Sequence, residues 1–419
     1  MARTPGKTAF AFIFLTVLVE MIGVGIILPA LPALIQNVAG VQIGDAAKIG
    51  GLLTLVFALG QFFCSPIVGA LSDRIGRRPV LIGSLLGYGV DYLIMGFAPL
   101  LAVLFVGRAL SGAFAATVST ANAYIADISP AEERGGRFGM LGAAFGLGFI
   151  IGPAIGGWIG GEFGPRAPFI TAGCLALANA AFGFFVLPET LKPEDRRAFD
   201  WRRANPVGGL MSVGKNRTLL AVLASFFLIQ TAWMVLPSTW PFFTTARLGW
   251  EEKEIGWSLA YVGLLAAFVQ GFFAGRVIKA LGEGKAALLG VVGMVGSFLF
   301  YTVAADWRVL YAGLTVGAVG GLVMPALQSL MSNATARNEQ GELQGALASV
   351  MAITMIVGPF TFTQVFGAFA PPDPVVLFLG APYALATALL VVGGLAFAAA
   401  VRGAGAPAPS GASLPAEGS

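Results

Sequence analysis

The chain of 419 residues contains no histidine, and only 11% of its residues are charged. A soluble domain normally carries about 25% charged residues, so this chain cannot cover itself with a polar surface. The absence of histidine removes the commonest protein ligand for metals and the side chain that titrates nearest to neutral pH. We find no metal-ligand cluster and no Ser or Cys nucleophile beside a plausible base, so we predict neither a metal site nor an enzyme.

Cysteine is also scarce. Cys64 and Cys174 both lie inside apolar runs, and we interpret them as buried small residues without a disulfide framework. The basic residues are few and scattered over short loops, although the net charge is +4. This scatter argues against a nucleic-acid patch and is typical of the positive-inside signal of membrane proteins.

Hydrophobic residues make up 57% of the chain, and they fall into twelve long runs. Because a membrane helix requires about 20 apolar residues, we predict an all-α membrane protein with twelve transmembrane helices. The predicted spans are 9–35, 47–71, 79–98, 100–127, 137–161, 167–187, 218–246, 254–278, 285–304, 307–333, 343–369 and 375–401.

The side on which Lys and Arg gather gives the orientation. Of the 25 Lys and Arg residues, 19 lie on the side of the N-terminus and 5 on the other side. This bias predicts a multi-pass protein of the inner (plasma) membrane with both termini in the cytoplasm.

Two motifs recur at a spacing of 206 positions. The shift carries Gly69, Asp73 and Gly76 onto Gly275, Lys279 and Gly282, and Gly152-Pro153 onto Gly358-Pro359. The repeat indicates a duplicated six-helix unit, and parallel halves of this kind place a binding site between them. We therefore predict an N-terminal bundle (1–187), a cytoplasmic linker (188–217), a C-terminal bundle (218–401) and a disordered tail (402–419).

The loop after the second run carries a dense polar motif. Its glycines permit a tight turn, and Asp73 can accept hydrogen bonds from a helix N-terminus or pair with an arginine. Such a latch would close one side of the protein in one state and open in the other, whereas an ordinary positive-inside loop is the alternative. We predict a gate formed by Gly69, Asp73, Arg74, Gly76, Arg77 and Arg78, together with Asp127 at the end of the fourth run.

Three charged residues lie deep in predicted spans. At 1.5 Å per residue, Arg108 lies roughly 12 Å, and Glu20 and Asp91 roughly 18 Å, from the nearer helix entry. Charges at such depth are costly and mark function, although a structural ion pair or a role in helix packing is the alternative. A carboxyl group with water access from alternate sides suits a proton carrier, so we predict that Glu20, Asp91 and Arg108 couple transport to protons.

The fifth run is rich in glycine at a spacing of four, which places several glycines on one face. The residues are Gly148, Gly152, Pro153, Gly156 and Gly157. A generic small-residue packing face would show the same spacing.

The full spacing of the loop motif resembles the signature loop of the major facilitator superfamily, and the glycines of the fifth run resemble the motif of its antiporters. The segment from Glu20 to Pro32 is similar to the first helix of the tetracycline/proton antiporters, as are Asp91-Tyr92 and the segment ending at Gln328. The resemblance implies the major facilitator fold, in two six-helix halves.

The same resemblance implies export of a tetracycline, chelated to a divalent cation such as Mg²⁺, in exchange for protons. It implies that the side chains of Gln61 and Gln328 bind the substrate. It also implies that the partners are a small-molecule drug, protons and the lipid bilayer, with no cofactor beyond the proton gradient. We expect a monomer.

The chain departs from that family in its second half. Many of these pumps carry a membrane histidine and an aspartate where this chain has Ala266 and Met294. Coupling must then use the carboxylates of the first half. Three alternatives stay open: an exporter of another drug or amphipathic metabolite, a nutrient importer, and a receptor that keeps the transporter fold.

Overall fold

The computed structural model describes residues 5–115, 117–197, 217–333, 335, 339–371 and 377–403. Within them the regular structure is entirely helical, and twelve segments are long and apolar enough to cross a membrane. The predicted all-α class with twelve spans is confirmed. The first half contains α1 (Pro5–Ile27), α2 (Leu31–Ala39), α3 (Ile43–Ile75), α4 (Arg77–Phe97), α5 (Leu101–Phe114), α6 (Thr117–Ile128), α7 (Ala131–Phe163) and α8 (Ala167–Val186).

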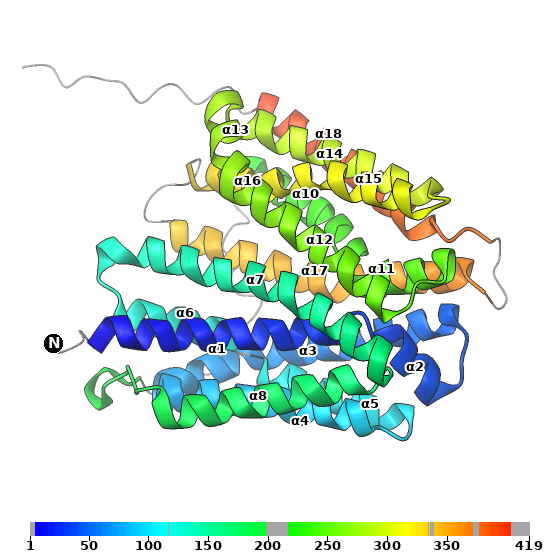
Figure 1. The fold of residues 1–419 in the computed structure, drawn as a ribbon. Helices are drawn as coiled ribbons and strands as arrows, with labels where there is room; N and C mark the ends of the chain where they lie inside the picture. The colour runs from blue at the N-terminus through cyan, green and yellow to red at the C-terminus, as the bar shows by residue number, and fades with distance from the viewer. Residues whose placement is uncertain are drawn as a thin grey trace, which may run out of the picture.

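The second half follows a short 3₁₀ turn, η1 (Pro193–Asp195), and the predicted linker residues 198–216 lie outside the described part. It contains α10 (Arg217–Trp233), α11 (Val235–Leu248), α12 (Glu252–Phe268), η2 (Val269–Phe273), α13 (Ala274–Leu281), α14 (Glu283–Val303), α15 (Trp307–Gly317), η3 (Ala318–Leu322), α16 (Val323–Asn333), α17 (Gln340–Phe369) and α18 (Ala381–Gly403). Figure 1 shows the helices of the two halves as two neighbouring groups that run along one axis.

The first predicted span is wrong in its extent. The run 9–35 is one stretch of apolar sequence, but α1 ends at Ile27 and α2 begins at Leu31. Pro29 and Pro32 explain the break, because proline lacks a backbone N–H and restricts the residue before it to extended conformations. A hydropathy pattern does not reveal this break, because a proline does not interrupt the run of apolar residues.

The repeat of 206 positions is visible in the helix boundaries. Trp233 ends α10 206 positions after Ile27 ends α1, and Phe369 ends α17 206 positions after Phe163 ends α7. Helices α4 and α14 are both 21 residues long, and each follows a single glycine with positive φ, Gly76 (115°) or Gly282 (79°). Since L side chains rarely adopt this conformation, the repeated glycines are required by the backbone at these turns.

The glycines of α7 point to two different neighbours. A Cβ at Gly152 would lie 2.7 Å from the Cα of Gly25 in α1, and one at Gly156 would collide with the carbonyl of Ile26. A Cβ at Gly157 would instead collide with the backbone of α12, 2.9 Å from the Cα of Gly256. Helix α7 therefore packs backbone to backbone against α1 in its own half and against α12 in the other half.

Among the described residues, the close contacts between the two halves gather toward one end of the bundle. At that end, called here the joined end, Gly44 N–H donates to the carbonyl of Pro371 at 3.2 Å, and the Gln364 amide donates to the carbonyl of Lys48 at 3.1 Å. Toward the other end, called the basic end because Arg74, Arg77 and Arg78 lie there, a Cβ on several glycines of both halves would meet nothing within 4 Å. Those glycines are Gly69, Gly135, Gly139, Gly142, Gly271, Gly275 and Gly341.

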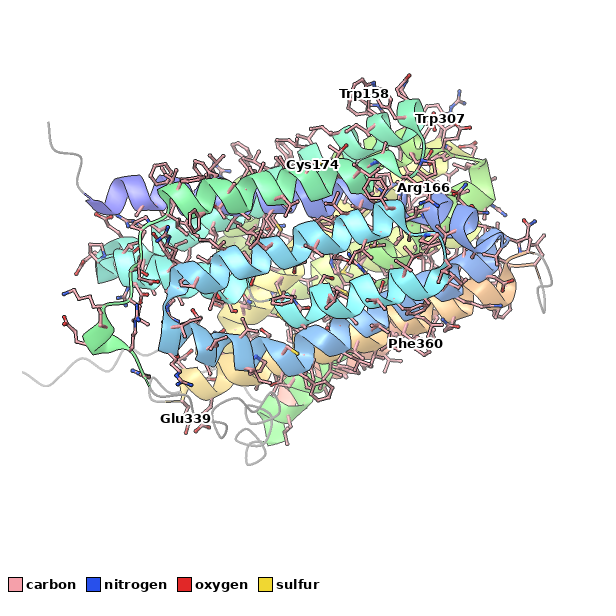
Figure 2. All side chains as sticks on the ribbon, turned by 90° about the horizontal axis from the view of Figure 1, so that it is seen from below. Trp158, Arg166, Cys174, Trp307, Glu339 and Phe360 are labelled. Carbon is pink, nitrogen blue, oxygen red and sulfur yellow. The ribbon has the colours of Figure 1, made fainter. Side chains whose placement is uncertain are left out.

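Figure 2 shows side chains along the whole bundle. Trp158, Arg166 and Trp307 lie near the joined end, and Glu339 lies toward the basic end. The two tryptophans are 52% and 54% exposed, as expected for aromatic side chains at a membrane interface. The prediction that both cysteines are buried is wrong: Cys174 is exposed on α8 and Cys64 is half-buried, because helices in a bilayer also turn small apolar residues toward lipid.

We expect Gly156→Ala to destabilise the protein by about 1–3 kcal/mol, because the added methyl group overpacks the contact with α1. Gly142→Ala is the matched control on the same helix, since its methyl group would enter open space. Thermal unfolding of the purified protein in detergent measures both. Equal midpoints for the two variants would contradict the packing described here.

Candidate functional site

A buried ion pair joins two of the three predicted coupling residues. Arg108 in α5 donates from its guanidinium to the carboxylate of Asp91 in α4. Asp91 is fully buried, and the Arg108 side chain is 14% exposed. Gly107 makes room for this pair, because a Cβ there would lie 2.7 Å from the Asp91 carboxylate. The Asp91 side chain thus faces the interior of the first half rather than lipid.

Glu20, the third residue predicted to couple transport to protons, lies in α1 and is 6% exposed. The Thr117 side chain of α6 stands beside its carboxyl group, and the Tyr88 hydroxyl of α4 lies within electrostatic reach of Glu20 and Arg108. Among the described residues, no group hydrogen-bonds to Glu20 Oε2. The depth of Glu20 is set by the next residue, Met21, whose backbone packs on Gly148 of α7.

Two aromatic rings enclose the arginine. The Arg108 guanidinium carbon lies 5.5 Å from the ring centroid of Phe57 and 5.9 Å from that of Tyr92. Such contacts stabilise a desolvated cation by about 2 kcal/mol. Phe57 also lines the cavity described next, so its ring is in contact with the ion pair's cation and with the cavity.

A cavity runs between the two halves. Its inner part, of about 220 Å³, is lined by Leu28 and Met234 at the two helix breaks and by Phe57, Phe242 and Pro359. Its outer part, of about 670 Å³, is bounded by α3, α6 and α17 and includes Gln61, Ser65, Asn122 and Met351. The two parts share the lining residues Ala58 and Met355, so they adjoin each other. A mostly apolar cavity with a few polar groups is what an amphipathic ligand requires.

The predicted gate residues form a network within the first half. Arg77 donates to Asp73 and, at 3.2 Å, to Asp127, which also accepts from the Thr190 hydroxyl at 3.2 Å. Arg78 donates to the carbonyl of Phe184. In this conformation the network joins α3, α4, α6, α8 and the segment 188–191, and within the described part of the chain none of these hydrogen-bond partners belongs to the second half.

Glu189 completes the network of the predicted gate residues. Its carboxylate accepts the backbone N–H groups of Arg77 at 2.9 Å and Arg78 at 3.2 Å, the free donors at the N-terminus of α4. A Cβ at Gly76 would collide with this carboxylate. Of the two roles predicted for Asp73, the structure shows the pair with an arginine, Arg77, whereas Glu189 accepts from the helix N-terminus.

The remaining predicted residues are distributed over the protein. Gln61 lines the cavity between the halves and donates to the carbonyl of Ala115 at 3.4 Å, whereas Gln328 lines a separate cavity in the second half. Arg74 is exposed at the basic end. Sequence reasoning missed Phe57, Tyr88, Thr117 and Glu189. Of these four, only Tyr88 could have been found from the sequence, because it lies three residues before Asp91 and therefore on the same helix face.

We expect Asp91→Asn to cost about 3–5 kcal/mol of stability, because it leaves Arg108 buried without its partner. The double variant with Arg108→Gln should recover a large part of that loss. Asp45→Asn, which breaks an exposed pair with Lys48, is the control and should cost less than about 1 kcal/mol. Additive single losses in a double-mutant cycle, followed by thermal unfolding, would show that the two side chains do not interact.

We also expect Glu189→Gln to weaken the start of α4 by about 0.5–2 kcal/mol, the usual effect of losing a helix cap. Hydrogen–deuterium exchange should rise at the amides of Arg77 and Arg78. Glu194→Gln, on the exposed part of the same segment, should leave both amides unchanged. Equal exchange in the two variants would rule out the capping role.

The chain is similar to known proteins over most of its length. The family model for the Major Facilitator Superfamily matches residues 13–359. The tetracycline resistance protein, class C, of Escherichia coli is 37% identical over 364 residues, which cover 87% of this chain and 91% of that protein.

Two solved structures share the fold. The human organic anion transporter MFSD10 (TETRAN) is 25% identical with a TM-score of 0.68, and the match covers 94% of this chain and 100% of that one. A bacterial homologue of the human lysosomal transporter Spinster, in an inward-facing and unoccupied conformation, has a TM-score of 0.77 at 16% identity, over 96% of this chain and 98% of that one. The chain belongs to the major facilitator superfamily and, within it, to the family of the tetracycline resistance proteins.

Proposed function

We propose that the protein exports a tetracycline from the cell in exchange for protons by alternating access. The observation that carries the proposal is the buried cluster of Glu20, Asp91 and Arg108 beside a cavity between two repeated halves. The similarity to tetracycline resistance proteins over most of the chain supports the choice of substrate. A divalent cation such as Mg²⁺ would travel as part of the cargo, chelated by the drug.

The orientation in this proposal follows from charge. The basic end, with Arg74, Arg77 and Arg78, faces the cytoplasm of a cell whose inner membrane holds the protein. Because the contacts between the halves gather toward the joined end and the outer cavity lies between those contacts and the basic end, the conformation in this proposal is open to the cytoplasm and ready to receive drug.

Coupling in this proposal runs through the first half. Glu20 carries the proton, since its carboxyl group is buried and Oε2 lacks a partner among the described residues. Drug in the cavity contacts Phe57, whose ring packs on the guanidinium of Arg108. A shift of that ring would alter the field of Arg108 around Glu20 and favour proton release on the cytoplasmic side.

The test uses everted membrane vesicles with an acidic interior and radiolabelled tetracycline in the presence of Mg²⁺. We expect energised uptake that an uncoupler abolishes. Glu20→Gln should reduce energised uptake to background, because the amide cannot release a proton, while exchange of labelled for unlabelled drug continues.

Glu162→Gln is the matched control, since Glu162 is an exposed carboxylate at the joined end, and it should transport normally. Uptake driven only by the reversed proton gradient would indicate an importer. Binding without accumulation would indicate a receptor. Energised uptake of other drugs but not of tetracycline would replace the substrate and keep the mechanism.

A further inference from the structure

The seam between α7 and α12 is closed along only part of its length. The two helices run antiparallel from the joined end, where Gly157 lies opposite Gly256. Seven positions further from that end on each helix, Ile150 lies opposite Gly263, and a Cβ on this glycine would be 2.6 Å from Ile150 Cγ1. Equal steps along the two helices therefore stay opposite each other, because both rise by the same distance per residue.

Beyond these contacts the same two faces are open. A Cβ at Gly142 or Gly139 of α7, or at Gly271 or Gly275 of the other half, would meet nothing within 4 Å. Eight further positions on each helix carry the register from Ile150 and its partner to Gly142 and Gly271. The π turn η2 then inserts one extra residue, because its hydrogen bonds span five positions instead of four, so Gly139 matches Gly275.

The open faces end in opposite charges. Lys279 lies four positions beyond Gly275, and Glu132 lies seven positions before Gly139, so each shares the face of its glycine. The register places Lys279 opposite Gly135, which is one helical turn from Glu132. Both charged side chains are exposed, and within the described part of the chain neither forms a hydrogen bond or an ion pair.

The neighbouring carboxylates already have partners in their own half. Glu133 accepts from Arg137 at 2.7 Å, one turn further along α7. Glu283, at the start of α14, accepts from two side chains of α16. Glu132 and Lys279 are therefore the charges that these contacts leave for each other.

The repeat shows that Lys279 does not have the role of its counterpart. Asp73 occupies the corresponding position of the first half, 206 positions earlier, and pairs with Arg77. The matching residues of the second half are Lys279 and Glu283, and among the described residues no ion pair joins them. A lysine that its own half does not use is available to the other half.

We propose that Glu132 and Lys279 form an ion pair across the seam when the halves close at the basic end, and that this pair latches the opposite conformation. The open glycines of the two faces would let the backbones approach as Gly157 and Gly256 do at the joined end. Closure would also exclude water around the two charges, which strengthens their attraction. The inference rests on alternating access in the proposed function and not on the choice of substrate.

Disulfide formation tests the register in the purified full-length protein in lipid nanodiscs. The background carries Cys64→Ser and Cys174→Ser, which remove the native thiols. Gly139→Cys combined with Gly275→Cys should form a disulfide under mild oxidation, because closure brings the two Cα atoms within about 7 Å. Mass spectrometry of the cross-linked peptides measures the yield.

The matched control is a pair on the same two faces but out of register. Gly135→Cys combined with Gly271→Cys should stay reduced, since the two positions lie about two helical turns apart along the seam. A disulfide in the control pair alone, or in neither pair, would overturn the closure at this register.

Charge reversal tests the latch itself, through tetracycline accumulation in energised everted vesicles. Lys279→Glu should lower accumulation about two- to fivefold, the usual size of an exposed ion pair. Adding Glu132→Lys should restore it. Adding Glu133→Lys instead should not, because that carboxylate lies about 100° around the helix and already pairs with Arg137.

Thermal unfolding in nanodiscs checks that each variant is folded. A charge reversal without effect, a loss that Glu132→Lys does not recover, or equal recovery by both lysines would overturn the ion pair.

The two measurements separate this inference from the proposed function. If the in-register disulfide forms but the unsubstituted protein accumulates no tetracycline, the closure stands and the proposed substrate fails. If the protein accumulates tetracycline but neither the disulfide nor the charge reversal behaves as expected, the transport function stands and the latch is wrong.

Discussion

The close approach of backbones along α7 is the contact on which the rest of the structure depends. Gly148, Gly152 and Gly156 hold α1 at the distance that buries Glu20, and Gly157 holds α12 of the other half against the opposite side of the same helix. One helix thus fixes the position of Glu20, the proposed proton carrier, and the seam between the halves at once. In lipid, where apolar surface alone does not drive helices together, such backbone contacts replace the hydrophobic core of a soluble protein.

The duplication shows how the two halves have diverged. They share helix breaks, helix lengths and glycine turns at one spacing of 206 positions, so the backbone plan is the same in both. Their chemistry differs, because the position that corresponds to Asp91 is Ser297 and the one that corresponds to Arg108 is Leu314. The first half keeps an ion pair and a lone carboxyl group, whereas the second half offers amides, an indole and thioethers.

The sequence was sufficient for the twelve spans, the repeat and the charged residues Glu20, Asp91 and Arg108, because hydropathy and depth along a helix are local properties. It was not sufficient for the break at Leu28, which depends on backbone donors rather than on polarity. It was also not sufficient for Glu189, because that residue caps a helix that begins 112 positions earlier in the chain. Phe57 was missed because its importance lies in its contact with Arg108, which is distant in sequence. The roles of the predicted site residues remain predictions.

The distribution of charge has an electrical consequence. Among the described residues, the groups with formal charge that the bundle buries at mid-depth are Glu20, Asp91 and Arg108, and all three belong to one half. A membrane potential acts on each elementary charge with about 2.3 kcal/mol per 100 mV across its full thickness. Voltage would therefore act at mid-depth on the first half, since the described residues of the second half bury no charge there.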